Sequence, residues 1–125
     1  MELIKEAYNK KTIKIAELGI GYYYGVAKLL NNHNDIDLIV VDMNKDAINK
    51  ANKQGLNGVV DNIFNPSDNI YKDIDIIYSI RPPRDLQPYI LNICKKNNCK
   101  LIIKPLSGEQ PIDSLKLVNY KGAPL

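Results

Sequence analysis

The sequence is poor in the residues that build most metal, redox and nucleophilic sites. Its 125 residues include one histidine, His33, and two cysteines, Cys94 and Cys99. His33 lies in a polar run of asparagine and aspartate, so no Ser-His-Asp triad can be argued from it. No group of cysteine and histidine has the spacing of metal ligands, and we expect no metal site. Two cysteines indicate free thiols in a reducing compartment rather than a disulfide framework.

Long apolar segments are also missing. No run approaches the roughly 20 residues that cross a membrane. The first residues lack the apolar stretch and the small-residue cleavage site of a secretory signal. We therefore expect a cytoplasmic protein. Hydrophobic residues make up 45% and charged residues 25%, as in soluble globular proteins, and the length predicts one domain, residues 1–125.

Arginine is scarce for a sequence that is rich in lysine. Of 17 cationic residues only two are arginines, Arg81 and Arg84, and they lie within four residues of each other. The net charge of +3 is too small to indicate a nucleic-acid partner. Two arginines in one short stretch, against this background, mark that stretch as a candidate binding loop.

Short apolar runs alternate with helical patterns along the chain. The runs are nearly continuous in apolar residues, which is typical of parallel strands covered on both faces. They are Ile13–Leu18, Asp37–Val41, Gly58–Val60, Ile74–Ile80 and Leu101–Ile103, with a weaker one at Leu115–Tyr120. The alternation predicts an α/β fold: a Rossmann-like, doubly wound and mostly parallel sheet of five or six strands in the order 3-2-1-4-5. Leu3, Ile4, Ala7 and Tyr8 predict a leading helix.

A glycine-rich turn follows the first predicted strand. Gly19 and Gly21 permit a tight turn and a close backbone approach to a ligand. A dinucleotide site favours a third glycine where Tyr24 stands, so the spacing to Gly25 fits that class less well. Glu17, two residues before the first glycine, resembles motif I of class I S-adenosylmethionine-dependent methyltransferases. The alternative is a tight turn with an incidental glutamate.

Acidic residues end the second and third predicted strands. Asp42 lies 21 residues beyond Gly21, close to the spacing at which a carboxylate binds ribose hydroxyls. Met43 is placed to pack on an adenine ring, and Asp61 to meet an adenine amino group. A helix cap at Asp42, and a simple turn at Asp61 and Asn62, are the structural alternatives.

The fourth predicted strand leads into the loop Ser79-Ile80-Arg81-Pro82-Pro83-Arg84. In a 3-2-1-4-5 sheet this loop faces the glycine turn across the crevice. The prolines stiffen it, and the proline after Arg81 predicts an extended backbone there. We expect Ser79 and Arg81 to contact an anionic second ligand, because a guanidinium suits carboxylates and phosphates. Alternatively Arg81 pairs with Glu17, Asp61 or Glu109.

These segments together resemble a known family. The chain resembles, over nearly its whole length, a family of short, uncharacterised archaeal Rossmann-like proteins. The resemblance rests on residues 17–21, Asp42, 78–83 and 104–109. The family has no assigned activity and is distantly similar to class I methyltransferases. The 78–83 loop also resembles the Asn-Pro-Pro-Tyr motif of amino-methyltransferases, but Arg81 cannot orient an amine by accepting its hydrogen bond, so N-methylation is not predicted.

Three hypotheses follow for function. The first is binding of S-adenosylmethionine or S-adenosylhomocysteine through Glu17, Gly19, Gly21, Asp42 and Asp61, with a minimal methyltransferase activity whose catalytic residues the sequence does not reveal. The second is an NAD- or nucleotide-binding sensor or subunit without catalysis. The third is an interaction protein with an empty crevice. The length leaves no room for a lid, so we expect a partner subunit or a second copy to close the site. The three consecutive tyrosines at 22–24 would either cap a ligand or plug the site.

Overall fold

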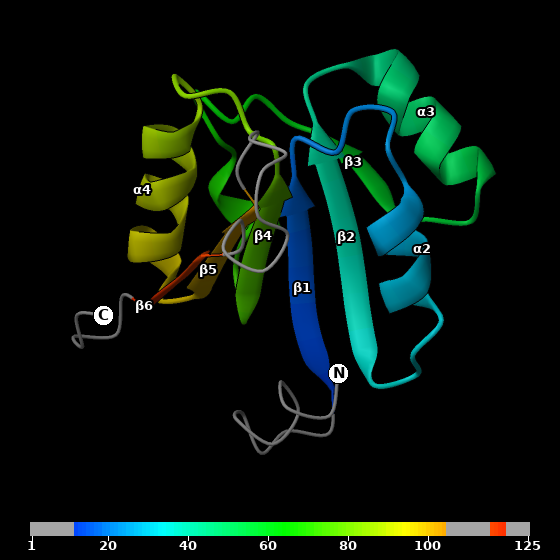
Figure 1. Ribbon diagram of the computed structural model, residues 1–125, viewed down its shortest axis with the longest axis horizontal. Coiled ribbons are helices and arrows are strands. Elements are labelled where there is room, and N and C mark those ends of the chain that lie inside the picture. The colour runs from blue at the N-terminus through cyan, green and yellow to red at the C-terminus, as the bar shows by residue number, and fades with distance from the viewer. Residues whose placement is uncertain (1–11, 105–115, 120–125) are drawn as a thin grey trace.

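The computed structural model describes residues 12–104 and the strand 116–119 (Figure 1). The predicted leading helix, at Leu3–Tyr8, and the predicted loop that carries Glu109 lie outside the described residues.

The described chain forms one sheet of six strands in the order β3-β2-β1-β4-β5-β6. The first five strands pair in parallel, as predicted, and β6 pairs with β5 in the antiparallel direction. The strand bounds differ from the predicted runs by at most two residues. The strands are β1 (Ile13–Leu18), β2 (Ile36–Asp42), β3 (Gly58–Val60), β4 (Ile76–Ile80), β5 (Lys100–Lys104) and β6 (Lys116–Asn119).

Three α-helices and one short 3-10 helix connect the described strands. They are α2 (Gly25–Asn31), α3 (Lys45–Lys53), η1 (Asp68–Ile70) and α4 (Gln87–Asn97). The side chain of Asn44, not that of Asp42, caps α3 by accepting hydrogen bonds from the backbone N–H groups of Asp46 and Ala47. Helix α3 ends before Gly55, which has a φ of +85° that favours glycine.

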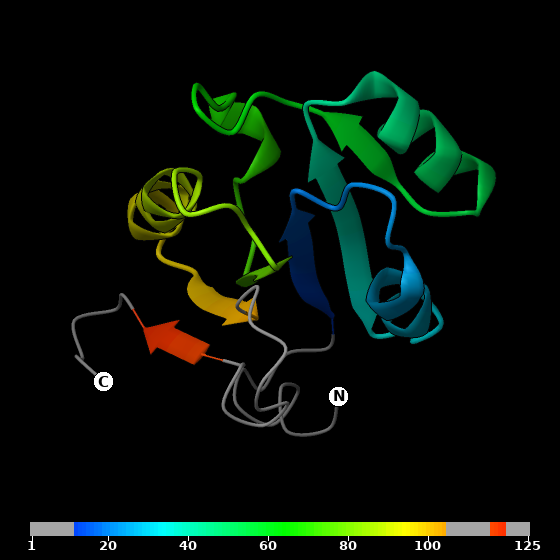
Figure 2. The same ribbon diagram turned by 45° about the horizontal axis from the view of Figure 1, so that its top comes forward.

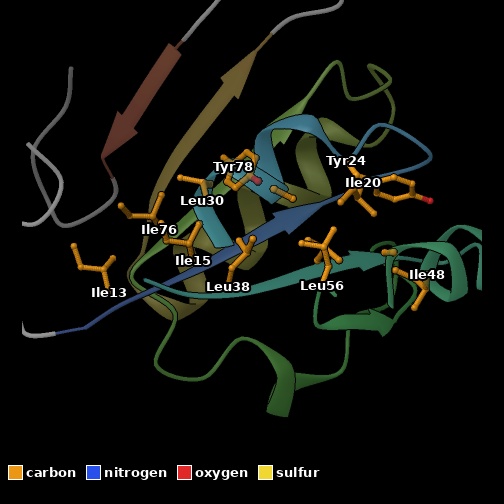
Figure 3. Close-up of a cluster of buried hydrophobic side chains, with 13 residues drawn as sticks. Ile13, Ile15, Ile20, Tyr24, Leu30, Leu38, Ile48, Leu56, Ile76 and Tyr78 are labelled. Atoms are coloured by element: carbon orange, nitrogen blue, oxygen red, sulfur yellow. The ribbon is translucent and has the colours of Figure 1, made fainter. Parts of the chain in front are cut away.

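The two faces of the sheet carry separate hydrophobic clusters. The face covered by α2 and α3 carries a cluster that includes Ile15 and Ile48 (Figure 3). Val40 and Ala27 belong to the same cluster. The other face packs against α4 and the segment between β3 and β4, which together bury the following residues: Ala16, Val41, Ile63, Tyr71, Ile77, Ile90, Ile93 and Leu101. Figure 2 shows helices on both sides of the sheet. Double coverage is the reason that the strands read as continuous apolar runs.

The two cysteines and the histidine lie in different environments. Cys94 and Cys99 are both fully buried, and the His33 side chain is exposed in the turn after α2. In the described part of the chain, no helix is long and apolar enough to cross a membrane.

The junction of β1 and β4 decides where a ligand site lies. The chain runs from β1 outward to β2 and β3, then returns to β4 on the other side of β1. Loops leaving the carboxyl ends of β1 and β4 therefore diverge to opposite faces of the sheet. Both loops start at strand ends that are marked by arrowheads in Figure 1.

Truncating the centre of β4 tests this packing. We expect Ile77→Ala to lower the free energy of unfolding by about 2–5 kcal/mol, because the side chain is fully buried and leaves a cavity. Leu29→Ala, at a position that is 69% exposed on α2, should stay within about 0.5 kcal/mol of the wild type. Urea denaturation of both variants measures the difference, and equal midpoints would contradict the packing described.

Candidate functional site

The glycine turn after β1 is fastened to the end of β2 by backbone hydrogen bonds. The N–H groups of Gly19 and Ile20 both donate to the Val41 carbonyl oxygen, at 2.8 and 3.2 Å. The N–H of Gly21 donates to Oδ2 of Asp42 at 2.8 Å. Gly19 and Gly21 have φ of +70° and +56°, a conformation that glycine adopts without steric cost. Three successive N–H groups of the turn are thus used inside the protein.

Asp42 is the centre of this arrangement. Its second oxygen, Oδ1, accepts the backbone N–H of Asn44 at 2.9 Å, so each carboxylate oxygen holds one loop. An ionised carboxylate has about four acceptor positions, and two of them remain for a ligand. Asp42 is half-buried and lines a cleft, which leaves its carboxylate within reach of ligand hydroxyl groups.

The cleft at the carboxyl ends of the strands has a volume of about 490 Å³. This lies within the range of small-molecule sites. Its walls come from the ends of β1 and β2, the loop after β3 and the loop after β4, and they are largely apolar. The lining residues are Gly19, Asp42, Met43, Ile63, Phe64, Pro82, Pro83, Asp85 and Leu86.

The tyrosines beside the glycine turn neither cap nor plug this cleft in the structure. Tyr22 donates its hydroxyl to Oδ2 of Asp46 at 2.9 Å, toward the start of α3. Tyr24 is buried and donates to the Ala47 carbonyl oxygen at 2.9 Å. Tyr23 is 61% exposed. None of the three lines the cleft, which therefore stays open at this side.

Glu17 lies beneath the glycine turn, fully buried on the face covered by α2 and α3. The Tyr78 hydroxyl, from the paired position on β4, donates to its Oε1 at 2.5 Å. Burial raises the pKa of Glu17 to about 7, although the Tyr78 hydrogen bond acts in the opposite direction. Burial and the neighbouring Glu17 carboxyl also raise the pKa of Tyr78. The pair ties β1 to β4 directly below the crevice.

Asp61 and Ser79 also make contacts within the protein. Asp61 accepts the Tyr71 hydroxyl at 2.8 Å and the Ser67 N–H at 3.3 Å, which folds the segment after β3 back on itself. Ser79 is buried and donates its hydroxyl to the Leu18 carbonyl oxygen at 2.7 Å, which joins the ends of β1 and β4. Neither side chain lines the cleft, so their proposed ligand contacts stay predictions.

Arg81 departs from the conformation that its sequence context predicts. Its φ is +53°, so the expected extended backbone before Pro82 is wrong. The reason lies in the neighbouring strand, because the Arg81 N–H donates to the Lys104 carbonyl oxygen at 2.6 Å and turns the chain at the end of β4. The Arg81 and Arg84 side chains are both exposed. Among residues 12–104, no carboxylate forms an ion pair with Arg81, which removes Glu17 and Asp61 as partners.

Phe64 and Leu86 are cleft residues that sequence reasoning missed. Phe64 is 40% exposed and lines the cleft together with Met43. Its ring contacts Tyr89 edge-to-face, with ring centroids 4.8 Å apart. The one available signal was that Phe64 is the sole phenylalanine of the sequence and follows a turn three residues after Asp61. Within the residues that the structure describes, no cluster of His, Cys, Asp and Glu is arranged to hold a metal ion.

The buried Glu17 carboxyl predicts a pH-dependent stability. Its pKa is raised in the folded state, so the folded protein holds a proton that the unfolded chain releases above pH 4.5. Stability should therefore fall as the pH rises from 4.5 to above 7, by about 3 kcal/mol for this group.

Glu17→Gln keeps an acceptor for Tyr78 and should remove this slope, whereas Asp37→Asn, at an exposed position on β2, should retain it. Urea midpoints measured across this pH range provide the comparison. Identical slopes in the wild type and Glu17→Gln would show that Glu17 does not hold the proton.

Solved structures that are similar to this chain include one dehydrogenase and several methyltransferases. Saccharopine dehydrogenase from Saccharomyces cerevisiae matches with a TM-score of 0.65 at 17% identity, over 79% of this chain and 22% of that protein. The plantazolicin methyltransferase BpumL in complex with SAH matches with a TM-score of 0.62 at 19% identity, over 81% of this chain and 42% of the methyltransferase. A TehB-like SAM-dependent methyltransferase from Corynebacterium glutamicum matches with a TM-score of 0.59 at 19% identity, over 82% and 59%. These likenesses establish a Rossmann-like fold, and the chain spans only part of each neighbour.

Sequence relatives place the chain more closely. A UPF0146 protein from Methanocaldococcus jannaschii is 54% identical over 123 residues, which cover 98% of this chain and 88% of the relative. A UPF0146 protein from Pyrococcus horikoshii is 49% identical over 90% of this chain and 85% of the relative. The model of the uncharacterised protein family UPF0146 matches residues 1–125. The chain belongs to the UPF0146 family.

Proposed function

We propose that this protein binds a nucleoside cofactor of the S-adenosylmethionine type, S-adenosylmethionine or S-adenosylhomocysteine, in the cleft at the carboxyl ends of β1, β2 and β4. The observation that carries the proposal is the cleft itself: about 490 Å³, with largely apolar walls, the carboxylate of Asp42 at the end of β2 and that of Asp85 in the loop after β4. The plantazolicin methyltransferases BpumL and BamL and the N-terminal domain of EvdMO1, which are similar in fold, hold SAH. The cofactor class is therefore consistent with both the fold and the lining.

The ribose and the adenine ring of such a cofactor have matching groups in the cleft. Asp42 has acceptor positions left for two ribose hydroxyls. Met43 and Phe64, which are 54% and 40% exposed, offer apolar surfaces for an adenine ring. Gly19 lines the cleft with backbone alone, in a conformation with a φ of +70° that favours glycine. Gly21 acts through its hydrogen bond to Asp42.

The state of the glycine turn favours this cofactor over NAD. A dinucleotide site binds pyrophosphate through free N–H groups of the turn and the following helix. Here the N–H groups of Gly19, Ile20 and Gly21 are all hydrogen-bonded to the end of β2. A nucleoside that carries a thioether or sulfonium instead of a diphosphate does not need these donors. NAD therefore remains the second candidate, and the experiment below includes it.

Glu17 and Asp61 have indirect roles in this proposal. A contact between Glu17 and the amino-acid end of the cofactor requires the hydrogen bond from Tyr78 to open. A contact of Asp61 with adenine likewise competes with Tyr71 and Ser67. We propose that both carboxyl groups hold the walls of the cleft in place. The proposal assigns no methyl acceptor and no catalytic residue. It places the protein in the cytoplasm, where a partner subunit or a second copy would close the cleft.

Calorimetric titration of the purified protein tests the proposal directly. We expect saturable heat with S-adenosylmethionine and S-adenosylhomocysteine and none with NAD at the same concentration. Binding of NAD alone would favour the nucleotide-sensor alternative. Absence of heat with every ligand at millimolar concentration, with a cooperative unfolding transition in the same sample, would leave the empty-crevice alternative.

Variants of the apolar walls localise the site. Met43→Ala and Phe64→Ala should each weaken S-adenosylhomocysteine binding about five- to hundredfold, the range expected for loss of one stacking partner of a base. Both side chains are largely exposed, so the melting temperature should change little. Leu29→Ala, also exposed but on α2, is the matched control and should bind like the wild type. Equal affinity in all three variants would show that the ligand does not bind in this cleft.

A further inference from the structure

We propose that Arg81 forms an oxyanion-binding site at the β4–β5 rim of the cleft, for a carboxylate or phosphate group. A role of this anion site in cofactor binding rests on the proposed function. The anion site itself is argued from the geometry around Arg81 and is tested without any cofactor.

The backbone of Arg81 is the first observation. A left-handed φ of +53° is uncommon for a residue with a side chain, and a following proline disfavours helical backbone further. The conformation is held by the 2.6 Å hydrogen bond from the Arg81 N–H to the Lys104 carbonyl oxygen. Pro82 is buried, and its own carbonyl oxygen accepts Nε2 of Gln87 at 3.2 Å. Strained residues that the surrounding structure holds in place occur preferentially at functional sites.

The distribution of charge around the cleft is the second observation. On the β1–β3 side the acids are committed: Asp42 to two backbone N–H groups, and Asp61 to Tyr71 and Ser67. On the β4–β5 side lie Arg81, Arg84 and Lys104, with Asp85 as the one acid among the described residues of the loop between β4 and α4. The cations near these strand ends thus lie on the β4–β5 side, whereas the charged residues that line the cleft itself are Asp42 and Asp85.

The freedom of the Arg81 guanidinium is the third observation. Its side chain is exposed, and no carboxylate of the described residues pairs with it. Pro82 and Pro83 line the cleft, so Arg81 stands at its rim. Asp85 also lines the cleft and would repel an anion placed deeper inside. An oxyanion is therefore expected at the rim, where a guanidinium binds two of its oxygen atoms.

Two sources of such an anion are compatible with the rim. One is the carboxylate of the cofactor's own amino-acid tail, and the other is a carboxylate or phosphate on a separate ligand. The chemistry is the same, and only the molecule that carries it differs. S-Adenosylhomocysteine and 5′-methylthioadenosine distinguish these sources, because the second has the same nucleoside and a thioether but no carboxylate.

The scarcity of arginine makes a direct measurement available. The sequence has two arginines, so a ¹H–¹⁵N spectrum of arginine Nε groups contains two resonances, and Arg84→Gln assigns them. Inorganic phosphate is titrated into the protein without cofactor, against chloride at equal ionic strength. We expect a saturable shift of the Arg81 resonance with phosphate and not with chloride. Shifts that are the same with chloride, or equal for both arginines, would overturn the site.

Substitutions at Arg81 separate ligand binding from structure. Arg81→Gly and Arg81→Gln should weaken phosphate binding, followed by ³¹P line broadening, by at least about tenfold. Arg81→Gly should melt no lower than the wild type, because glycine adopts this φ without strain. Lys95→Gln, which removes an exposed cation near the end of α4, is the matched control and should retain binding. Phosphate affinity unchanged in both Arg81 variants would refute the proposal.

The cofactor arm then identifies the source and keeps the two proposals apart. If S-adenosylhomocysteine, but not 5′-methylthioadenosine, shifts the Arg81 resonance and displaces phosphate, the tail carboxylate occupies the site. If phosphate still binds in the presence of S-adenosylhomocysteine, the anion belongs to a second ligand. Phosphate binding without heat from S-adenosylhomocysteine would refute the cofactor proposal alone. Heat from S-adenosylhomocysteine without phosphate binding would refute the anion site alone.

Discussion

The attachment of the glycine turn to the end of β2 is the constraint on which the rest of the site depends. Val41 and Asp42 accept three successive N–H groups of that turn, so β1 and β2 end in one rigid unit. Without these bonds the turn would have unsatisfied donors beside an apolar cleft, which is costly. Asp42 also lines the cleft. One carboxylate thus shapes the pocket and supplies its main polar group.

The junction of β1 and β4 adds the second half of the site. Glu17 and Tyr78 join the strands below the crevice, and Ser79 joins them at the strand ends. These contacts hold the loop of Pro82 and Pro83 opposite the glycine turn. Glu17, which resembles a cofactor ligand in the sequence, therefore joins two strands of the sheet in the structure. The residues that face the cleft are mostly apolar, with hydrogen-bonding groups behind them.

The fold was predictable because its signals are local and repeated. Continuous apolar runs separated by helical patterns predict a parallel sheet covered on both faces, and the strand order follows from the common connectivity of such folds. The antiparallel pairing of β6 has no such signal, since its direction depends on how the chain returns to β5. The bend at Arg81 was also out of reach, because a hydrogen bond to Lys104 on another strand overrides the local preference of a residue before proline.

Residue types and spacing by themselves determined the Rossmann-like fold, and they predicted a ligand site at the edge of the sheet where Gly19 and Asp42 line a cleft. Only the tertiary structure decided what each polar side chain is doing there. Glu17, Asp61 and Ser79 look like ligand contacts in the sequence, yet the described structure commits each of them to a partner inside the protein. It also brought Phe64 to the cleft and left Arg81 without a carboxylate partner in the described residues. The physical reason is that a buried polar group must find a hydrogen-bond partner, and the partner comes from whichever strand the fold places beside it.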